Sequence, residues 1–344
     1  MTDITPATWL WLKVARLPDV MDELPQGFYV ETGALCNLRC PFCPTGNQSF
    51  KLEKKFLKFL DLERFKEILE KIEGFGKSMS LFAWGEPLLN PNILSLIRAA
   101  KAKRYSTIIS TNLSFSWDAR AAERLVASGL DSIVVSADGA TQENYQRYRV
   151  GGRLDWVLSN MRLIMSAKKR LDSAKPEVFW QYLMHRGNQG EIGLAQKIAR
   201  KLGVPMIFGL LRFPENDRKR WMTDPKGPSP SVAASPRKRK KDEAYSAPGA
   251  IMQNPAMCLQ PFIRPIIHSD GEMFPCKAMA AERHYSLGNV LTRDLWDIWN
   301  NPIAVAMRKY LRTGKRSKRD LPCYRCPMSP HGFSRAVEAN LAVK

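Results

Sequence analysis

The sequence has no long hydrophobic run, and this absence excludes membrane-spanning proteins. No apolar stretch among its 344 residues approaches the length that crosses a bilayer. Residues 9–12 near the N-terminus are apolar, but Lys13 and Arg16 interrupt too early for the core of a secretory signal peptide. We therefore expect a soluble, cytoplasmic protein, whose cysteines serve as metal ligands because the cytosol keeps thiols reduced.

Acidic residues are also scarce. The sequence contains 33 Asp and Glu but 53 Lys and Arg, which gives a net charge of +20. Two segments, residues 237–241 and 312–319, hold much of the excess. Such a field attracts acidic partners. An anionic membrane surface, a phosphorylated substrate and an acidic electron donor such as flavodoxin or ferredoxin fit this charge, and nucleic acid fits but is not favoured. A solvated surface is the plainer interpretation of the first segment.

With 44% hydrophobic residues, the chain can bury the core of one large domain and a smaller one. Between residues 27 and 213, β-rich runs alternate with helical patterns. The predicted strands span residues 28–31, 79–84, 106–111, 132–137, 178–184 and 206–211. The clearest helix follows Asp61, a plausible N-cap, and later ones span 119–127, 156–169 and 191–202. This alternation predicts an α/β fold with a parallel sheet and helices outside it.

Three cysteines, Cys36, Cys40 and Cys43, lie close together directly after the first predicted strand. A structural zinc or a fully held iron-sulfur cluster takes four protein ligands. Three thiolates therefore leave one metal position open for a ligand that is not protein. A zinc knuckle, or three unrelated buried cysteines, is the plainer alternative.

This cysteine spacing, with the aromatic Phe42 before the third cysteine, resembles the signature of the radical S-adenosylmethionine (SAM) enzymes. The resemblance implies a 4Fe-4S cluster whose fourth iron binds SAM, and reductive cleavage of SAM to a 5'-deoxyadenosyl radical. It also implies that residues 27–213 form a partial (β/α)6 barrel. In such barrels the chemistry lies at the C-terminal ends of the strands.

The predicted strand ends carry further motifs that resemble this family. Residues 83–87 read Ala-Trp-Gly-Glu-Pro, so Gly85 and Glu86 correspond to the motif that meets the SAM amino group, with Trp84 in place of the commoner glycine. By the same resemblance Asn112 would lie at the edge of the SAM pocket, Ser136 would contact the methionine moiety, and Arg149 would face the carboxylate. Each alone is also an ordinary turn former or cap.

Four more cysteines follow a basic, Pro- and Ser-rich linker or insertion at residues 214–250, and residues 1–26 form a separate N-terminal segment. They are Cys258, Cys276, Cys323 and Cys326. Residues 251–344 resemble the SPASM domain and its truncated twitch form, and four thiolates suffice for one auxiliary 4Fe-4S cluster. Asp270-Gly271 suits a hairpin turn that brings Cys258 near Cys276. A structural zinc is the alternative for four thiolates.

The two predicted clusters favour an oxidoreductase. The adenosyl radical would take a hydrogen atom from the substrate, and the auxiliary cluster would accept the next electron, as in the twitch-bearing aminoglycoside dehydrogenases. A small-molecule or carbohydrate-like substrate is favoured, because few residues precede Gly27 for a domain that grips a leader peptide. Peptide crosslinking or maturation is the alternative, and a non-catalytic, metal-bearing basic binding protein is the second.

Other outcomes of the radical chemistry depend on residues that are harder to assign. Epimerisation by a cysteine is disfavoured since no thiol is spare, although Tyr182 could donate a hydrogen atom, and methyl transfer stays open. His185, at the end of the fifth predicted strand, is the candidate general base. Arg212, at the end of the sixth, is the candidate ligand for a phosphate or carboxylate of the substrate.

Overall fold

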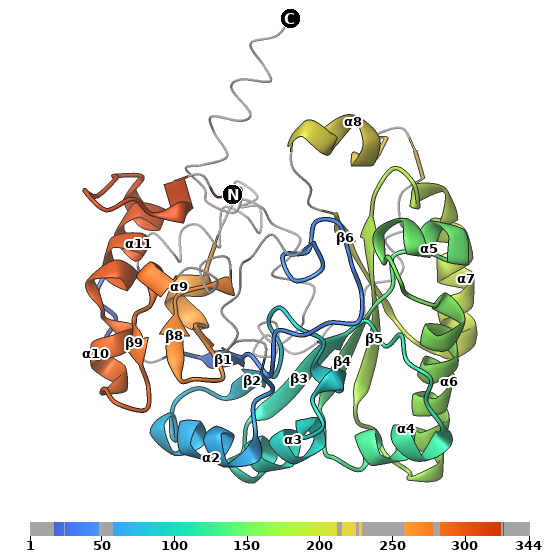
Figure 1. The fold of residues 1–344 in the computed structure, drawn as a ribbon, viewed down its shortest axis with the longest axis horizontal. Helices are drawn as coiled ribbons and strands as arrows, with labels where there is room; N and C mark the ends of the chain where they lie inside the picture. Colours follow the sequence, from blue (N-terminus) through green and yellow to red (C-terminus); the bar gives the residue numbers. More distant parts are fainter. Residues whose placement is uncertain are drawn as a thin grey trace, which may run out of the picture.

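The computed structural model describes residues 17–47 except 24, then 58–211, 215–224, 227–228, 258–277, 283–324 and 326. A curved sheet forms its centre, and the helices between the strands lie on the outer side of the curve (Figure 1). None of the described helices is long and apolar enough to cross a membrane. Most of the predicted linker, including the basic run at 237–241, lies outside the described residues.

Six parallel strands pair in sequence order, which confirms the predicted barrel-like sheet. They are β1 (Gly27–Val30), β2 (Ser78–Ser80), β3 (Ser106–Thr111), β4 (Ser132–Ser136), β5 (Glu177–Met184) and β6 (Met206–Leu210). The largest difference is at β2, which ends four residues before the predicted end. The Leu81 amide still donates to the Ile108 carbonyl of the next strand at 2.9 Å, and beyond it the amides of Trp84 and Glu86 bond to the loop after β1 instead.

Helices cover the convex face of this sheet (Figure 1). They are α2 (Leu62–Lys71), α3 (Ile93–Ala102), α4 (Ala119–Val126), α5 (Gln142–Tyr148), α6 (Leu154–Arg170) and α7 (Ile192–Leu202). Asp61 caps α2 as predicted, since its carboxylate accepts a hydrogen bond from the Arg64 amide at 2.8 Å. Phe65, Ile68 and Leu69 then bury the apolar face of the helix against the sheet.

Alternate strand residues point to opposite faces of the sheet, and this separates the core from the concave face. Phe28 and Val30 of β1 belong to the main core beneath the helices, whereas Tyr29 packs with Ile266 and Phe274 in a different cluster. Tyr29 and the other side chains that point the same way therefore line the concave side of the sheet.

The C-terminal part continues the same sheet. Strand β7 (Ile266–Ile267) runs parallel to β1, and β8 (Glu272–Phe274) and β9 (Gly288–Asn289) follow antiparallel, giving nine strands among the described residues. The turn between β7 and β8 confirms the predicted hairpin, since Gly271 has a φ of +87° that favours glycine. The amides of Tyr29 and Glu31 donate to the carbonyl oxygens of Pro265, just before β7, and Ile267 of β7, each at 2.9 Å, so the C-terminal part is fixed directly to β1.

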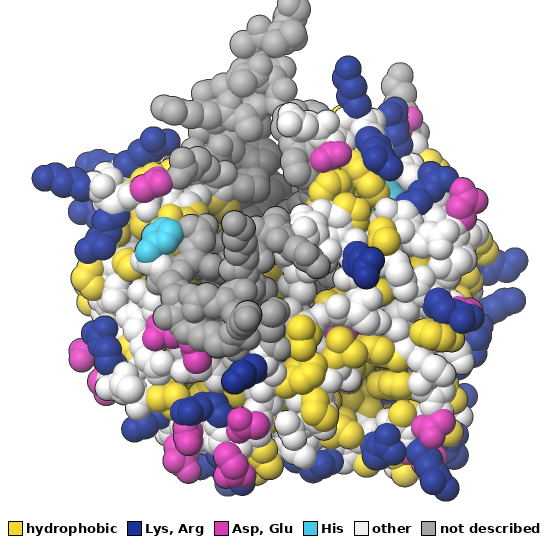
Figure 2. Space-filling view, viewed as in Figure 1, with side chains coloured by type: hydrophobic (Ala, Val, Ile, Leu, Met, Phe, Trp, Pro, Cys, Tyr) yellow, Lys and Arg dark blue, Asp and Glu magenta, His cyan; other side chains and the backbone are white. Residues whose placement is uncertain are grey.

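The remaining helices are α8 (Arg218–Trp221), α9 (Gln260–Ile263), α10 (Leu295–Trp299) and α11 (Pro302–Thr313). Helix α11 is held by Arg308, whose fully buried guanidinium donates to the carbonyl oxygens of Pro261 at 2.7 Å and Trp299 at 2.8 Å. After α11, the basic side chains between residues 315 and 319 are exposed. Figure 2 shows Lys and Arg side chains spread around the rim of this face, so the positive charge is broadly distributed.

Candidate active site

The loop after β1 brings the first three cysteines together. The Cys43 amide donates to the Cys40 carbonyl at 3.1 Å, and the Leu38 amide points at the Cys36 sulfur at 3.4 Å. Burial raises the pKa of the Cys36 thiol to about 12, and Glu86, Cys40 and Cys43 raise it further by repulsion. The three thiols thus lie within electrostatic reach of one another.

The donor set of this loop suits an iron-sulfur cluster, because thiolates are the protein ligands that such clusters take. In the described part of the chain, no three Cys, His, Asp or Glu side chains converge tightly enough to hold one metal ion. A zinc ion needs ligand atoms about 2.0–2.3 Å from its centre. Three thiolates would leave one metal position of a four-iron cluster without a protein ligand.

Gly85 allows the loop after β2 to approach the cysteine loop. A β-carbon at this position would lie 1.8 Å from the Gly33 carbonyl oxygen, so no other residue fits without moving the backbone. The next amide, that of Glu86, donates to the Leu35 carbonyl at 2.7 Å. The glycine predicted as a SAM contact therefore also has a packing role, and its contact with SAM stays a prediction.

Glu86 joins the ends of β2 and β3. Its buried carboxylate accepts hydrogen bonds from the Thr111 hydroxyl and the Asn112 amide, both at 2.7 Å, and from the Leu88 amide at 3.1 Å. Burial raises the pKa of Glu86 to about 7, against the hydrogen bonds, which lower it. Its three protein donors position the loop, and the predicted contact with the SAM amino group stays a prediction.

A second buried carboxylate, Glu31, was not predicted as part of the site. It accepts hydrogen bonds from the Trp84 amide at 2.6 Å and the Gly33 amide at 3.2 Å. Burial raises the pKa of Glu31, while these hydrogen bonds lower it. Its position directly after β1 was the only signal in the sequence, because its partner Trp84 comes from a distant loop.

Asn112 lies beside the cysteine loop, as the resemblance predicts for a residue at the pocket edge. Its side-chain amide donates to the Asn37 side chain at 2.9 Å and approaches the Cys36 sulfur at 3.7 Å. Its carbonyl oxygen accepts from the Ser114 amide at 2.8 Å. The side chain is therefore held in one orientation next to a cluster ligand.

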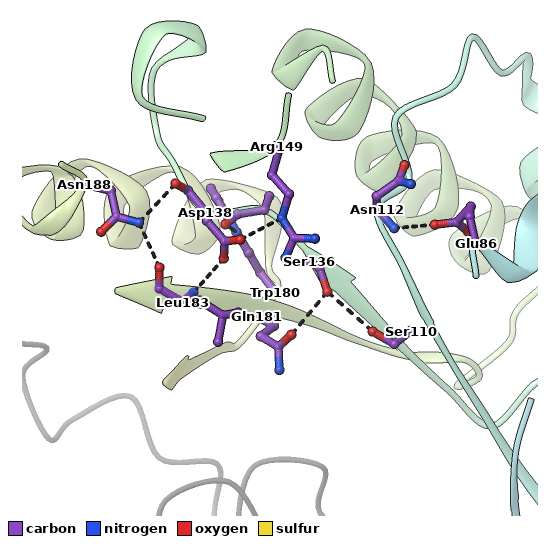
Figure 3. Close-up of polar contacts among 11 residues, drawn as sticks. Glu86, Ser110, Asn112, Ser136, Asp138, Arg149, Trp180, Gln181, Leu183 and Asn188 are labelled. Atoms are coloured by element: carbon purple, nitrogen blue, oxygen red, sulfur yellow. Dashed lines mark hydrogen bonds and ion pairs between the residues drawn. The ribbon is translucent and has the colours of Figure 1, made fainter. Parts of the chain in front are cut away.

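Ser136 belongs to a polar row across the concave face (Figure 3). Its hydroxyl donates to the Gln181 side chain at 3.2 Å and lies 3.4 Å from the Ser110 hydroxyl. The adjacent residues Ile109, Val135 and Trp180 belong to the core, so these three polar side chains face the concave side. Ser110 and Gln181 were not predicted, and the contact of Ser136 with SAM stays a prediction.

Arg149 forms a buried ion pair with Asp138, which Figure 3 shows between β4 and the helix above it. Its Nε donates to the Asp138 carboxylate at 2.7 Å, and the other carboxylate oxygen accepts from the Leu183 amide at 2.6 Å. Burial raises the pKa of the Cys40 thiol, while the positive charge of Arg149 lowers it. Arg149 therefore lies next to a cluster ligand, and its predicted contact with the SAM carboxylate stays a prediction.

Aromatic side chains shield the cysteine loop. Phe42 stacks on Tyr148 with centroids 6.1 Å apart and meets Trp221 of α8 edge-on at 5.2 Å. The His185 ring lies 4.9 Å from Trp221. The three cysteines of the loop pack within or against this same cluster. An aromatic wall of this kind lowers the local dielectric beside the cysteine loop.

His185 is almost fully buried, at 1% exposure. Its Nδ1 accepts a hydrogen bond from the Gly187 amide at 3.1 Å, so the neutral ring carries its proton on Nε2. Nε2 has no hydrogen-bond partner in the described structure. Burial lowers the pKa of His185 to about 4, with a contribution from Arg147. The ring thus presents a donor, and its role as a general base stays a prediction.

The other two candidates differ in what the structure says of them. Arg212 lies outside the described residues. Tyr182 faces the helices in the main core, and its hydroxyl donates to the Asn188 carbonyl at 2.9 Å. That orientation separates Tyr182 from the concave face, so a role as hydrogen-atom donor has no structural support.

The four C-terminal cysteines approach one another around Cys323. Burial raises the pKa of the Cys323 thiol well above its ordinary value, and Cys276, Cys258 and Cys326 each raise it further. Cys276 follows the β7–β8 hairpin, and the short 3₁₀ turn Pro322–Tyr324 carries Cys323. Four neighbouring thiols from three distant segments fit a fully held iron-sulfur cluster.

Comparisons with known proteins match both cysteine groups. Residues 30–174 match the family model described as Radical SAM superfamily, and residues 258–327 match SPASM, an iron-sulfur cluster-binding domain. The PqqA peptide cyclase of Granulibacter bethesdensis is 24% identical over 323 residues, which cover 88% of this chain and 80% of that protein.

Two solved structures share the fold. Streptococcus suis SuiB bound to S-adenosylmethionine aligns with a TM-score of 0.61 at 16% identity, covering 90% of this chain and 72% of SuiB. BtrN in complex with AdoMet and 2-DOIA aligns with a TM-score of 0.53 at 18% identity, covering 90% of this chain and 93% of BtrN.

Proposed function

The chain carries a radical SAM domain followed by a SPASM domain, and on this premise we propose that it oxidatively modifies a peptide. These domains imply iron-sulfur clusters and S-adenosylmethionine as cofactors. The observation that carries the proposal is the similarity to PqqA peptide cyclase, which covers 88% of the chain and so extends across both domains. This favours the peptide alternative over the small-molecule dehydrogenase that the sequence analysis preferred.

In this proposal Cys36, Cys40 and Cys43 hold the first cluster. With SAM bound, that cluster supplies a 5'-deoxyadenosyl radical for hydrogen abstraction. The protein holds the surrounding loops in place through Glu86, which links them by its three hydrogen bonds, and through the ion pair of Arg149 with Asp138. Phe42, Tyr148 and Trp221 exclude water from this region.

Cys258, Cys276, Cys323 and Cys326 hold the auxiliary cluster, which supplies an acceptor for one electron from the oxidised substrate. Loss of a hydrogen atom, an electron and a proton together removes two hydrogen atoms from the peptide. The polar row of Ser110, Ser136 and Gln181 faces the concave side and offers hydroxyl and amide groups to a bound substrate.

Oxidation of a small molecule is the second candidate. Four cysteines fully ligate only one auxiliary cluster, which is the expectation for the truncated twitch form of the small-molecule dehydrogenases. The proposal also includes domain boundaries near residues 213 and 251. It further includes His185 as the general base and Arg212 as the ligand of a phosphate or carboxylate of the substrate. An acidic electron donor also stays a proposal, supported by the net charge of +20.

The test is anaerobic incubation of the reconstituted protein with SAM, dithionite and synthetic peptides encoded beside its gene. Mass spectrometry should find a peptide lighter by two hydrogen atoms, with 5'-deoxyadenosine formed alongside, and Cys40→Ser should form neither. Oxidation of aminocyclitols under the same conditions, with every peptide unchanged, would replace the proposal by the second candidate.

A further inference from the structure

A cationic side chain lies at the junction of the barrel and the SPASM domain. Lys277 directly follows Cys276, and its ammonium lies 3.9 Å from the centroid of the Tyr29 ring and 4.2 Å from that of Phe82. The two rings meet edge-on, 5.7 Å apart. Cation–π contacts with two aromatic faces hold the ammonium at this position.

These rings belong to the concave face. Tyr29 packs with Ile266 and Phe274 apart from the main core, and Phe82 follows Leu81, which belongs to that core. Lys277 as a whole residue is half-buried, and burial of its amine lowers the pKa of that amine. The site therefore lies next to Cys276, on the face that also carries the polar row of Ser110 and Ser136.

Arg264 adds a second positive charge. Its guanidinium carbon lies 5.6 Å from the Tyr29 ring centroid, and one terminal nitrogen donates to the Ser78 hydroxyl at 2.9 Å. Its buried Nε has no hydrogen-bond partner in the described structure. Burial alone would raise the pKa of Tyr29, yet the charges of Lys277 and Arg264 bring it below its ordinary value. Tyr29 therefore lies in the electrostatic field of both cations.

The neighbouring carboxylate offsets this potential through its charge, without a hydrogen bond to Lys277. Glu31 is the carboxylate that acts on Lys277, but its oxygens already accept hydrogen bonds from the Trp84 and Gly33 amides. Within the described part of the chain, Lys277 itself has no ion pair or hydrogen bond. An ammonium carries three donors and no acceptor, and leaving such groups unpaired in a partly dry site is costly.

We propose that Lys277 and Arg264 form a subsite that binds a carboxylate of the substrate, such as the side chain of a glutamate or aspartate. A carboxylate accepts hydrogen bonds from both cations and neutralises the site. Tyr29 and Phe82 supply apolar contact for the methylene groups of the same side chain. The inference rests on the proposed function in one respect, namely that the substrate is a peptide.

The test measures binding and needs no turnover. The probes are N-acetyl-glutamate amide and its glutamine analogue, titrated anaerobically into the reconstituted, SAM-saturated protein and followed by saturation-transfer NMR. Saturating SAM prevents the probes from binding at the SAM site. The wild type should bind the acid about tenfold more tightly than the amide, because one charge-assisted hydrogen bond contributes that much.

Lys277→Met should lose most of the preference for the acid, because only Arg264 then remains to bind it, whereas Lys277→Arg should keep the preference. The control is Lys66→Met, which removes an exposed charge on α2 and should behave as the wild type. Arg264→Gln offers a second variant should Lys277→Met fail to fold. Equal binding of acid and amide by the wild type, which requires no variant, would overturn the inference.

A second readout separates substrate binding from charge compensation of the neighbouring cluster. Lys277→Met could shift the midpoint potential of the C-terminal cluster, measured by EPR titration, while leaving the acid preference intact, and that result would also overturn the inference. Failure to modify peptides together with a retained acid preference would reject the proposed function alone.

Discussion

Replacing Gly85 by alanine tests how closely the loop after β2 must approach the cysteine loop after β1. The added β-carbon would lie 1.8 Å from the Gly33 carbonyl oxygen and 2.9 Å from that of Leu35. An ordinary carbon–oxygen contact is about 3.3 Å or longer, so the loop would have to move by about 1.5 Å. Both obstructing atoms belong to the backbone, so no side chain can rotate to relieve the overlap.

This movement would break the hydrogen bonds that join the loops. The Glu86 amide donates to Leu35 at 2.7 Å and the Trp84 amide donates to the Glu31 carboxylate at 2.6 Å. An added 1.5 Å or so takes both beyond the range of a hydrogen bond. Losing one neutral and one charge-assisted bond costs about 3 kcal/mol in the free energy of unfolding. SAM affinity should fall as well, because the displaced loop borders the cysteines.

Anaerobic denaturant titration and isothermal titration of SAM measure the two effects. Gly193→Ala is the matched control, since a β-carbon there meets nothing within 4 Å inside helix α7. The control should leave stability unchanged or raise it by up to about 1 kcal/mol. The reasoning is refuted if Gly85→Ala equals the wild type in both measurements.

Three further predictions concern buried ionisable groups. Asp138→Asn should lower the free energy of unfolding by about 3–5 kcal/mol in denaturant titration, because it leaves Arg149 buried without its counter-charge. The folded-state pKa of Glu86, about 7, exceeds its ordinary value of 4.5, so the folded state binds this proton more tightly than the unfolded state does. The free energy of unfolding should therefore fall by about 3 kcal/mol as the pH rises from 4.5 to 7. Glu86→Gln should remove that pH dependence, and an unchanged profile would contradict it. The pKa of His185, lowered to about 4, predicts a pH–rate profile without an inflection near 6.5 from this group.

The strands could be predicted because each is a short apolar run with a local pattern. Helix α3 was missed although Ile93, Leu96, Ile97 and Ala100 have helical spacing, so the signal was present in the sequence. Helix α5 is short and mostly polar, and it carries little periodicity. Strand β2 was predicted too long, because tertiary hydrogen bonds to Glu31 and Leu35 end it.

The residues of the candidate site also fall into those that local sequence patterns predict and those that depend on the fold. Cysteine ligands could be predicted because their spacing is local and metal chemistry demands a fixed number of thiolates. The partners of Glu86 and the pairing of Arg149 with Asp138 depend on which strand ends lie side by side, and sequence order alone does not supply that. Lys277 gave no signal as a concave-face residue, because its position follows from the pairing of β7 with β1.

Counting iron in paired cysteine variants tests the central claim that two cysteine groups hold two clusters with different roles. After anaerobic reconstitution, the wild type should hold about eight irons per chain, and Cys40→Ser and Cys276→Ser about four each. Cys40→Ser should form no 5'-deoxyadenosine from SAM and dithionite, whereas Cys276→Ser should form it without modifying a peptide. SAM cleavage that survives the loss of Cys40, or zinc in place of iron at the C-terminal cysteines, would contradict the account.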